Sequence, residues 1–315
     1  MNDGILSIGE HLGGTPCILS FDGQSLTFVE TLPPYSMRFK FSDPNYNPLV
    51  AYPIGPDVAP SSEYWKAGCS WTQISSEPNV WEYHREPTHY ETGFDGEASW
   101  MGEFFAKFGD YEHNSVEVLG GNTSGITSLE NLFSYDDAIT KVALFDTSSC
   151  INFQQMFYGG YDRDTDTYTS RLVEVPNFDF SSAYDVAQMF ENCVMLESTP
   201  AFDLHDACDA NSMFCNCQSL KAIPEMRVAK IGHPYYYIDH WLGGALCMDY
   251  MFMDCPNVAS GITDMYTALS TNGYDTAAQA AGVTPARHAM VFANCGVDSP
   301  SGSAELVAVP SSWKE

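Results

Sequence analysis

Apolar residues recur at fixed positions in the second half of the chain. The clearest pattern is Met-Phe, any residue, Asn or Asp, and then Cys, and it begins at Met189, Met213 and Met251. A related copy begins at Val291, and weaker copies contain only Met156-Phe157 and Leu132-Phe133. Self-similarity of this kind is typical of repeat proteins, in which each structural unit packs on the next one.

A second pattern, Pro-x-Phe-Asp, gives the length of the repeat. It begins at Pro176 and Pro200, and Pro224 begins an incomplete third copy, with 24 residues between neighbours (200 − 176 and 224 − 200). Met189 and Met213 are also 24 residues apart (213 − 189). A period of ~20–29 residues, with a short strand and a helical segment in each unit, is typical of leucine-rich repeats.

The unit that begins at Asp185 shows the elements we expect. Val186, Met189 and Phe190 have helical spacing, and Asp185 stands where an N-cap would. Residues 195–200 alternate like a short strand, which Pro200 ends. Repetition of such a unit predicts that Phe190 and its equivalents Phe214 and Phe252 form one buried column.

Three spacings exceed the period: 33 residues from Met156 to Met189, 38 from Met213 to Met251, and 40 from Met251 to Val291. The extra residues must leave the stack as loops, which often gather on a binding face. The second loop is rich in aromatic rings, and rings on a loop can anchor a ligand or pack on their own protein. The candidate binding residues are Tyr235, Tyr236, Tyr237, His240 and Trp241.

Residues 1–119 lack the repeat and are expected to form a separate unit. Apolar and polar residues alternate with period two at 25–30 and 36–41, and Pro-containing segments separate these runs. We therefore predict a small antiparallel β domain at 1–119 that docks the protein to a partner, followed by a repeat domain at 120–315. The core of the β domain is expected to contain Trp65, Trp71, Trp81 and Trp100.

The repeat resembles the BspA-type leucine-rich repeat, which is found in bacterial surface proteins and in proteins of gut bacteriophages. Residues 216–224 (NCQSLKAIP) are the closest copy, and residues 144–149 (LFDTSS) resemble the Phe-Asp-Thr-Ser turn of that family. The likeness covers about residues 120–310. It departs from the family at Tyr135-Asp136-Asp137 and at Gly159-Gly160, where Asn-Cys is expected.

The resemblance implies an α/β fold, in which the N-terminal antiparallel β domain precedes a leucine-rich-repeat-like solenoid of about six irregular coils. Members of the family bind proteins or surface components, and the motif brings no catalytic residues with it. Residues 32–39 (LPPYSMRF) and 118–125 (VLGGNTSG) are similar to phage-encoded proteins that join such a β domain to these repeats.

Charge narrows the choice of partners. Lys and Arg number 13 against 41 Asp and Glu, for a formal net charge of −28. Such a surface repels phosphate backbones and anionic headgroups, so nucleic acid is not an expected partner. Cations, neutral glycans and basic protein patches are the expected partners. The sequence has no run of about 18 apolar residues, and its start has no basic region followed by an apolar run. We expect neither membrane insertion nor a secretory signal.

Cysteine and carboxylate patterns were considered as metal or disulfide sites. Cys193, Cys217, Cys255 and Cys295 occupy one position of successive units, which favours buried thiols, although the strand separation would also permit disulfides. No CxxC pair supports zinc. Asp162-x-Asp164-x-Asp166 is similar to the start of a calcium loop but lacks the following Gly, so a solvated acidic loop is favoured. No cofactor is expected.

These patterns indicate a non-enzymatic surface-recognition or structural protein. The leading hypothesis is a bacteriophage virion component, made in the host cytoplasm, such as a head-decoration, fibre or tail-associated protein. Its partners would be virion structural proteins or host surface proteins and glycans, and a homo-oligomer is left open. The alternative is a BspA-like adhesin on a bacterial cell surface, and a third hypothesis is an intracellular binding scaffold. A hydrolase ranks below these because no catalytic motif is present.

Overall fold

The computed structural model of the chain describes residues 17–21, 26–31, 35–48, 69–77, 79–85, 89–91, 115–162, 165–205, 207, 209–228, 235–237, 240–242, 247–271 and 288–315. The first strands are β1 (Cys17–Phe21), β2 (Leu26–Thr31), β3 (Tyr35–Phe41), β4 (Cys69–Gln73), β5 (Val80–Arg85), β6 (His89–Glu91), β7 (Val116–Asn122) and β8 (Ile139–Val142). They are followed by β9 (Tyr161–Asp162), β10 (Thr167–Tyr168), β11 (Phe202–Leu204), β12 (Met226–Val228), β13 (Tyr235–Tyr237) and β14 (His240–Leu242). The helices are α3 (Ile262–Thr271), α5 (Pro300–Leu306) and the 3₁₀ helix η3 (Ser311–Trp313).

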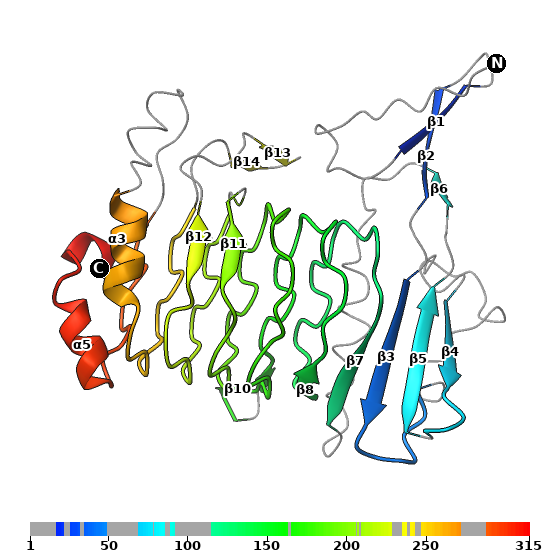
Figure 1. Cartoon of the computed structure of the whole chain (residues 1–315), viewed down its shortest axis with the longest axis horizontal. Helices are drawn as coiled ribbons and strands as arrows, with labels where there is room; N and C mark the ends of the chain where they lie inside the picture. Colours follow the sequence, from blue (N-terminus) through cyan, green and yellow to red (C-terminus); the bar gives the residue numbers. More distant parts are fainter. Residues whose placement is uncertain are drawn as a thin grey trace.

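A five-stranded sheet lies at one end of the repeat stack, and helices α3 and α5 lie at the other end (Figure 1). The strand order is β4-β5-β3-β7-β8, and all neighbours are antiparallel except β7 and β8. Alternate residues of β3, namely Met37, Phe39 and Phe41, are buried, which confirms the period-two pattern predicted for 36–41.

The predicted tryptophans of the N-terminal core divide into two pairs. Trp71 and Trp81 are buried, and the Trp71 ring lies 5.6 Å from the Phe39 ring. Trp65 and Trp100 lie outside the described residues. Strand β7 crosses the predicted domain boundary between residues 119 and 120, and one hydrophobic core runs from the sheet into the repeats. The division into two domains stays a prediction.

Backbone hydrogen bonds join each repeat unit to the next. Phe190 N–H donates to the Met213 carbonyl at 2.9 Å, and Asn192 N–H donates to the Cys215 carbonyl at 2.9 Å. The same bonds recur two and four residues earlier in the unit and in its neighbours. The intervening N–H groups close tight turns inside their own unit, as when Glu191 N–H donates to the Gln188 carbonyl at 3.1 Å.

Left-handed backbone conformations make this alternation possible. Gln188 and Asn192 have φ values of 57° and 66°, and Ser212 and Asn216, at the equivalent positions of the next unit, have 54° and 61°. Such values are uncommon outside glycine, although Asn tolerates them better than most residues. Their recurrence four residues apart turns the chain twice in each unit.

The predicted α/β solenoid of about six irregular coils is wrong. The described residues are mainly strand, turn and coil, with two short α-helices and small sheets, none of them closed or curled. Residues 185–190 form turns rather than a helix, since their alternate N–H groups bond the next unit instead of a carbonyl four residues back. Residues 195–200 contribute one parallel bridge, from Ser198 to Glu174, rather than a strand.

The predicted phenylalanine column is confirmed. The Phe190 ring lies 5.2 Å from Phe214, and Phe214 lies 5.4 Å from Phe252, with interplanar angles of 19° and 7°. All three side chains are fully buried. Phe157 and Phe292 extend the column on either side, at 5.5 Å and 6.0 Å from their neighbours.

The last ring of the column is covered by the C-terminal segment. Trp313, in η3, lies 6.3 Å from Phe292, and its carbonyl accepts a hydrogen bond from Phe292 N–H at 2.9 Å. Tyr266 from α3 meets the Trp313 ring edge-on at 5.3 Å. The capping segment therefore covers the last ring of the column and accepts the backbone hydrogen bond of Phe292, as a further repeat unit would otherwise do.

The equivalent cysteines are buried free thiols, as predicted. Cys193 donates its S–H to the Phe157 carbonyl at 2.9 Å, Cys217 to Phe190 at 3.1 Å, and Cys255 to Phe214 at 3.0 Å. Burial raises the pKa of all three thiols, which keeps them protonated and able to donate.

No helix among the described residues has the length and apolar character needed to cross a bilayer.

Replacement of Phe214 by Ala removes one ring from the middle of the column. We expect the free energy of unfolding to fall by about 3–5 kcal/mol, because the change leaves a cavity between Phe190 and Phe252. Urea unfolding followed by circular dichroism measures this. The control is Met195→Ala, since Met195 is 49% exposed and its loss should cost less than about 0.5 kcal/mol. Equal losses in the two variants would contradict the column's importance.

Candidate functional site: a polar row on the strand face

One exposed row of polar side chains crosses the side of the repeat stack that contains β11 and β12, which we call the strand face. Each unit here has alternating burial, as in Leu144-Phe145-Asp146, where the phenylalanine points into the core and its neighbours are exposed. The parallel pairing of β11 with β12 places Arg227 beside Asp203. Asp179 lies close enough to Asp146 and Asp203 for both of their charges to act on it. The row consists of Asn122, Asp146, Asp179, Asp203 and Arg227.

The buried residues that flank each acidic residue in the sequence hold the row in place. The Phe145 ring lies 4.7 Å from Phe178, and these side chains are buried. The Thr147 hydroxyl donates to the Asp179 carbonyl at 2.8 Å and accepts from Asp179 N–H at 2.9 Å. The Thr123 hydroxyl makes the equivalent bond to the Asp146 carbonyl. Asp146 and Asp179 are therefore anchored through their backbones to the preceding unit.

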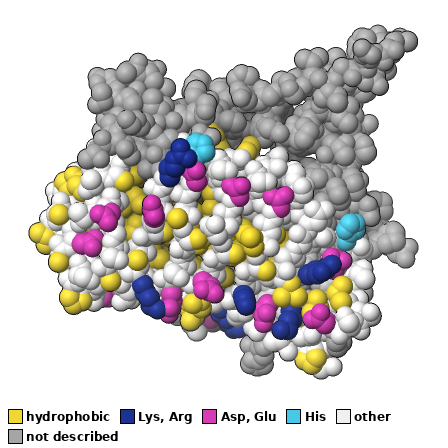
Figure 2. Space-filling view, viewed as in Figure 1, with side chains coloured by type: hydrophobic (Ala, Val, Ile, Leu, Met, Phe, Trp, Pro, Cys, Tyr) yellow, Lys and Arg dark blue, Asp and Glu magenta, His cyan; other side chains and the backbone are white. Residues whose placement is uncertain are grey.

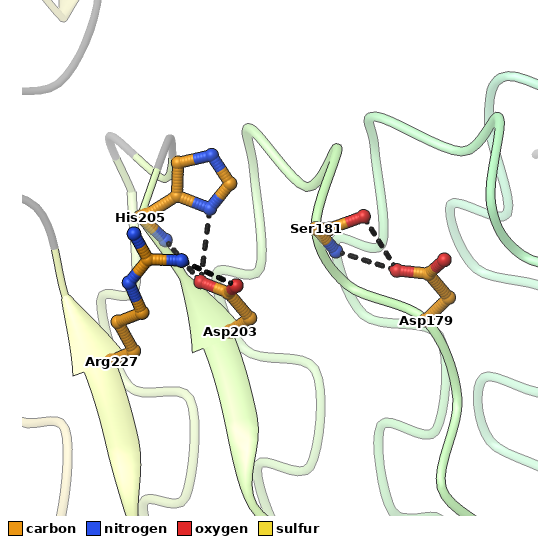
Figure 3. Close-up of polar contacts among 5 residues, drawn as sticks. All are labelled: Asp179, Ser181, Asp203, His205 and Arg227. Carbon is orange, nitrogen blue, oxygen red and sulfur yellow. Dashed lines mark hydrogen bonds and ion pairs between the residues drawn. The ribbon is translucent and has the colours of Figure 1, made fainter.

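The first two carboxylates are held by the same local turn. Asp146 Oδ1 accepts from the backbone N–H of Ser148 at 3.0 Å and from its hydroxyl at 2.7 Å. Asp179 Oδ1 accepts the corresponding bonds from Ser181 at 2.9 Å and 2.6 Å (Figure 3). In both turns one carboxylate oxygen has a fixed position while the side chain stays exposed.

Asp203 carries basic partners instead of a serine. His205 Nδ1 lies 2.9 Å from Asp203 Oδ1, and Arg227 Nη1 donates to Asp203 Oδ2 at 3.0 Å (Figure 3). The row therefore changes from acidic to basic at this end. Figure 2 shows the result as a line of acidic side chains along the upper margin of the described surface, beside a histidine and basic side chains.

All three carboxylates of the row are charged at neutral pH. Hydrogen bonds from the Ser148 side chain and backbone lower the pKa of Asp146, and Ser181 does the same for Asp179. Desolvation acts to raise the pKa of Asp203, but the bonds from His205 and Arg227 outweigh it and the pKa is lowered. The row thus presents fixed negative charge suited to a cationic partner.

A second row of polar residues lies where parallel bridges join the units. Asn152 pairs with Asp185, and Asp185 pairs with Asp209. Asp185 Oδ1 accepts from Ala187 N–H at 2.9 Å, and Asn152 Oδ1 makes the same bond to Gln154 at 2.9 Å. Desolvation, followed by the charges of Asp209 and Glu130, raises the pKa of Asp185 to about 7.

The predicted aromatic residues of the second insertion lie on the hairpin of β13 and β14. The register places Tyr236 opposite Trp241 and Tyr237 opposite His240, while Tyr235 pairs with Leu242. The hairpin therefore brings the backbones of the predicted binding residues together. The structure describes the backbone of this hairpin and not its side chains. Figure 1 draws this hairpin beyond the ends of β11 and β12, at the upper edge of the stack.

The possible calcium loop and other metal sites find no supporting geometry in the described part of the chain. Asp166 accepts a hydrogen bond from the Tyr161 hydroxyl, and Asp162 Oδ1 accepts from Thr165 N–H at 3.4 Å. Asp164 lies outside the described residues. Elsewhere in the described ranges, no three His, Cys, Asp or Glu side chains come close enough to hold a metal ion.

The polar row was missed by sequence reasoning, although its members stand in the repeat. Asp179 and Asp203 belong to the Pro-x-Phe-Asp pattern, and Asp146 to the segment LFDTSS. The pattern identified a period and left open which face these residues would occupy. The signal that could have revealed the row is the Ser two residues after Asp146 and Asp179, which is typical of a side chain that closes a turn.

Comparison with known proteins gives one family match. Residues 100–225 match the model of a family described as Mycoplasma protein of unknown function, DUF285. This range contains strand β7, the first repeat units and the acidic members of the polar row. Neither the curated proteins nor the solved structures include a match to the chain.

Stability should fall as pH rises between about 4 and 7. The pKa of Asp185 is higher in the folded protein than the 3.8 of a free side chain, so the folded state binds the proton more tightly. Its contribution is fully present below the unfolded pKa and is lost as pH rises through about 7. Asp185→Asn should flatten this slope and stabilise the protein at pH 8 by on the order of 1 kcal/mol.

Urea unfolding at pH 5 and pH 8 tests this expectation. Asn152 already makes the same turn at the equivalent position, so the substitution keeps the acceptor for Ala187 N–H. Asp179→Asn is the matched control, because the pKa of Asp179 is lowered and its titration falls below this range. An unchanged slope in Asp185→Asn would exclude Asp185 as the source.

Proposed function

We propose that this protein is a non-enzymatic recognition or structural protein that uses its strand face to attach to another surface. The observation that carries the proposal is the polar row, whose charged groups are repeated in register and held by hydrogen bonds. Fixed groups lose little side-chain entropy on binding, so an extended face of this kind suits recognition of a large partner. The hairpin of β13 and β14, with Tyr236 and Trp241, belongs to the same proposed contact region.

The proposed setting is a bacteriophage virion, with the protein as a head-decoration, fibre or tail-associated component. The support is the similarity of residues 32–39 and 118–125 to phage-encoded proteins that join a β domain to such repeats. In this role the N-terminal sheet docks to the particle and the strand face meets host surface proteins or glycans. The strongly negative net charge of −28 favours a neutral or cationic target.

The alternative is a BspA-like adhesin on a bacterial cell surface, which binds protein or matrix. The match of residues 100–225 to a family described from Mycoplasma, together with the BspA-type repeat, favours this setting. Proteomics of purified phage particles and of washed bacterial surfaces separates the two. Recovery with capsid proteins supports the virion role, recovery in the bacterial surface fraction supports the adhesin, and recovery only in cytosol contradicts both.

Neutralising part of the polar row should weaken attachment without unfolding the protein. Asn122 Oδ1 accepts from Ser124 N–H at 3.2 Å, so Asn already serves at this position of the row. The double variant Asp146→Asn with Asp179→Asn should keep its stability within about 0.5 kcal/mol. Its affinity for the particle or cell surface should fall by roughly tenfold and depend less on salt. Unchanged affinity at low salt would exclude the row from the contact.

The hairpin is tested by Tyr236→Ala with Trp241→Ala. If these residues anchor the partner, attachment should weaken by about 2 kcal/mol or more per anchor while the melting temperature stays unchanged. If they only pack on their own protein, the melting temperature should fall and attachment per folded molecule should not. Measuring both quantities on this variant decides between the two roles, and a stability loss with full attachment contradicts the contact role.

A further inference from the structure

A second exposed surface lies away from the polar row and is made of tyrosines. Tyr135, Tyr161 and Tyr168 are 53%, 44% and 40% exposed, which is high for large rings, and the half-buried Tyr158 lies among them. Figure 1 draws β10, which contains Tyr168, at the lower edge of the stack, opposite the edge toward which β11 and β12 run. We call these four residues the tyrosine patch.

Ring contacts and backbone bonds hold the patch together. Tyr135 N–H donates to the Tyr158 carbonyl at 2.8 Å, and the two rings are 5.0 Å apart. Tyr161 and Tyr168 oppose each other across the hairpin of β9 and β10, with ring centroids 5.2 Å apart. The patch therefore joins two neighbouring repeat units to the first insertion.

Gly159 and Gly160 permit this arrangement, which explains why they replace the Asn-Cys of other units. A Cβ on Gly159 would lie 2.1 Å from the Asn192 carbonyl oxygen. A Cβ on Gly160 would lie 2.9 Å from the Thr169 hydroxyl and 3.4 Å from the Tyr135 carbonyl. The glycine pair lets the insertion fold back beside Tyr135.

Carboxylates border the rings. Asp166 accepts the Tyr161 hydroxyl, and Glu191 lies near Tyr158, with its Oε2 bonded to Gln188 Nε2 at 2.8 Å. Burial, followed by the charge of Glu191, raises the pKa of Tyr158 to about 12, so this hydroxyl stays neutral. The patch thus combines neutral aromatic faces with acidic groups at its border.

We propose that the tyrosine patch binds an arginine-bearing segment of a partner protein. The proposal rests on the recognition role argued above and adds a second contact surface to it. A guanidinium stacks on aromatic faces and bonds carboxylates, so it uses both features of the patch. A second copy of this chain, also at −28, would be repelled, and a neutral glycan would gain nothing from the carboxylate charge.

The experiment uses the full chain and a short Gly-Ser peptide that contains two arginines. The matched probe has citrulline in place of arginine, which keeps the shape and removes the charge. Titration followed by NMR of labelled tyrosine rings should give a Kd for the arginine peptide at least about tenfold lower than for the citrulline peptide. Raising the salt concentration should weaken the arginine peptide selectively.

Variants locate the site. Tyr135→Ala with Tyr168→Ala should raise the Kd of the arginine peptide about tenfold at unchanged melting temperature, and Tyr168→Phe should retain binding because the ring remains. Leu144→Ala, at a 60% exposed residue of the strand face, is the control and should have no effect.

Four results would overturn the proposal. The first two are no measurable binding of the arginine peptide and equal binding of the citrulline peptide. The third is binding that the tyrosine variants leave unchanged but that is lost in Asp146→Asn with Asp179→Asn. The fourth is tyrosine-dependent binding of a neutral oligosaccharide, such as cellohexaose, that does not depend on salt. Recovery of the protein with particles or cell surfaces is measured separately. Failure of that assay with intact peptide binding contradicts the proposed function alone, and the reverse result contradicts the tyrosine patch alone.

Discussion

The structure depends on the way each repeat unit satisfies its backbone. Half of the N–H groups in the segment that begins at Val186 have no acceptor inside their own unit and bond carbonyls of the next unit. A buried N–H without a partner costs free energy comparable to a lost hydrogen bond, so no single unit can be stable alone. Stability must therefore come from stacking, and it requires a cap where stacking ends. At the C-terminal end, the Trp313 carbonyl and ring supply that cap.

Stacking in register has a direct effect on side chains. Because equivalent residues of neighbouring units lie side by side, one residue type repeated along the sequence becomes a column or a row in space. Phe190 and Phe214 stack as rings, and Cys217 donates its S–H to the Phe190 carbonyl of the neighbouring unit. The same rule places Asp185 beside Asp209, where burial, followed by the like charge of Asp209, raises the pKa of Asp185. Stacking in register buries a column of apolar residues, which is favourable, whereas it brings the like charges of a row of acids together, which is unfavourable.

Sequence reasoning reached the features that follow from periodic patterns, both the repeat of 24 residues and the period-two alternation of strands. It predicted the Phe column, the burial of the equivalent cysteines and the strands near 25–30 and 36–41. It was wrong about the helix at 185–190, since spacings of three and four residues occur both on a helical face and in two consecutive tight turns. Left-handed conformations at Gln188 and Asn192 decide between the two, and side-chain periodicity carries no information about them. The prediction of an α/β fold failed for that reason.

The surfaces were harder to predict than the core, and the reason differs between them. The polar row follows the period, so its residues could be found, but which face they occupy depends on the alternation of burial around Phe145 and Phe178. The tyrosine patch does not follow the period: Tyr135 and Tyr158 come from two units, while Tyr161 and Tyr168 come from an insertion. Only the fold of the insertion brings them together, and Gly159 and Gly160 provide the space for it. A regular stack thus sets the core and the rows, and its irregular segments create surfaces that no repeated pattern encodes.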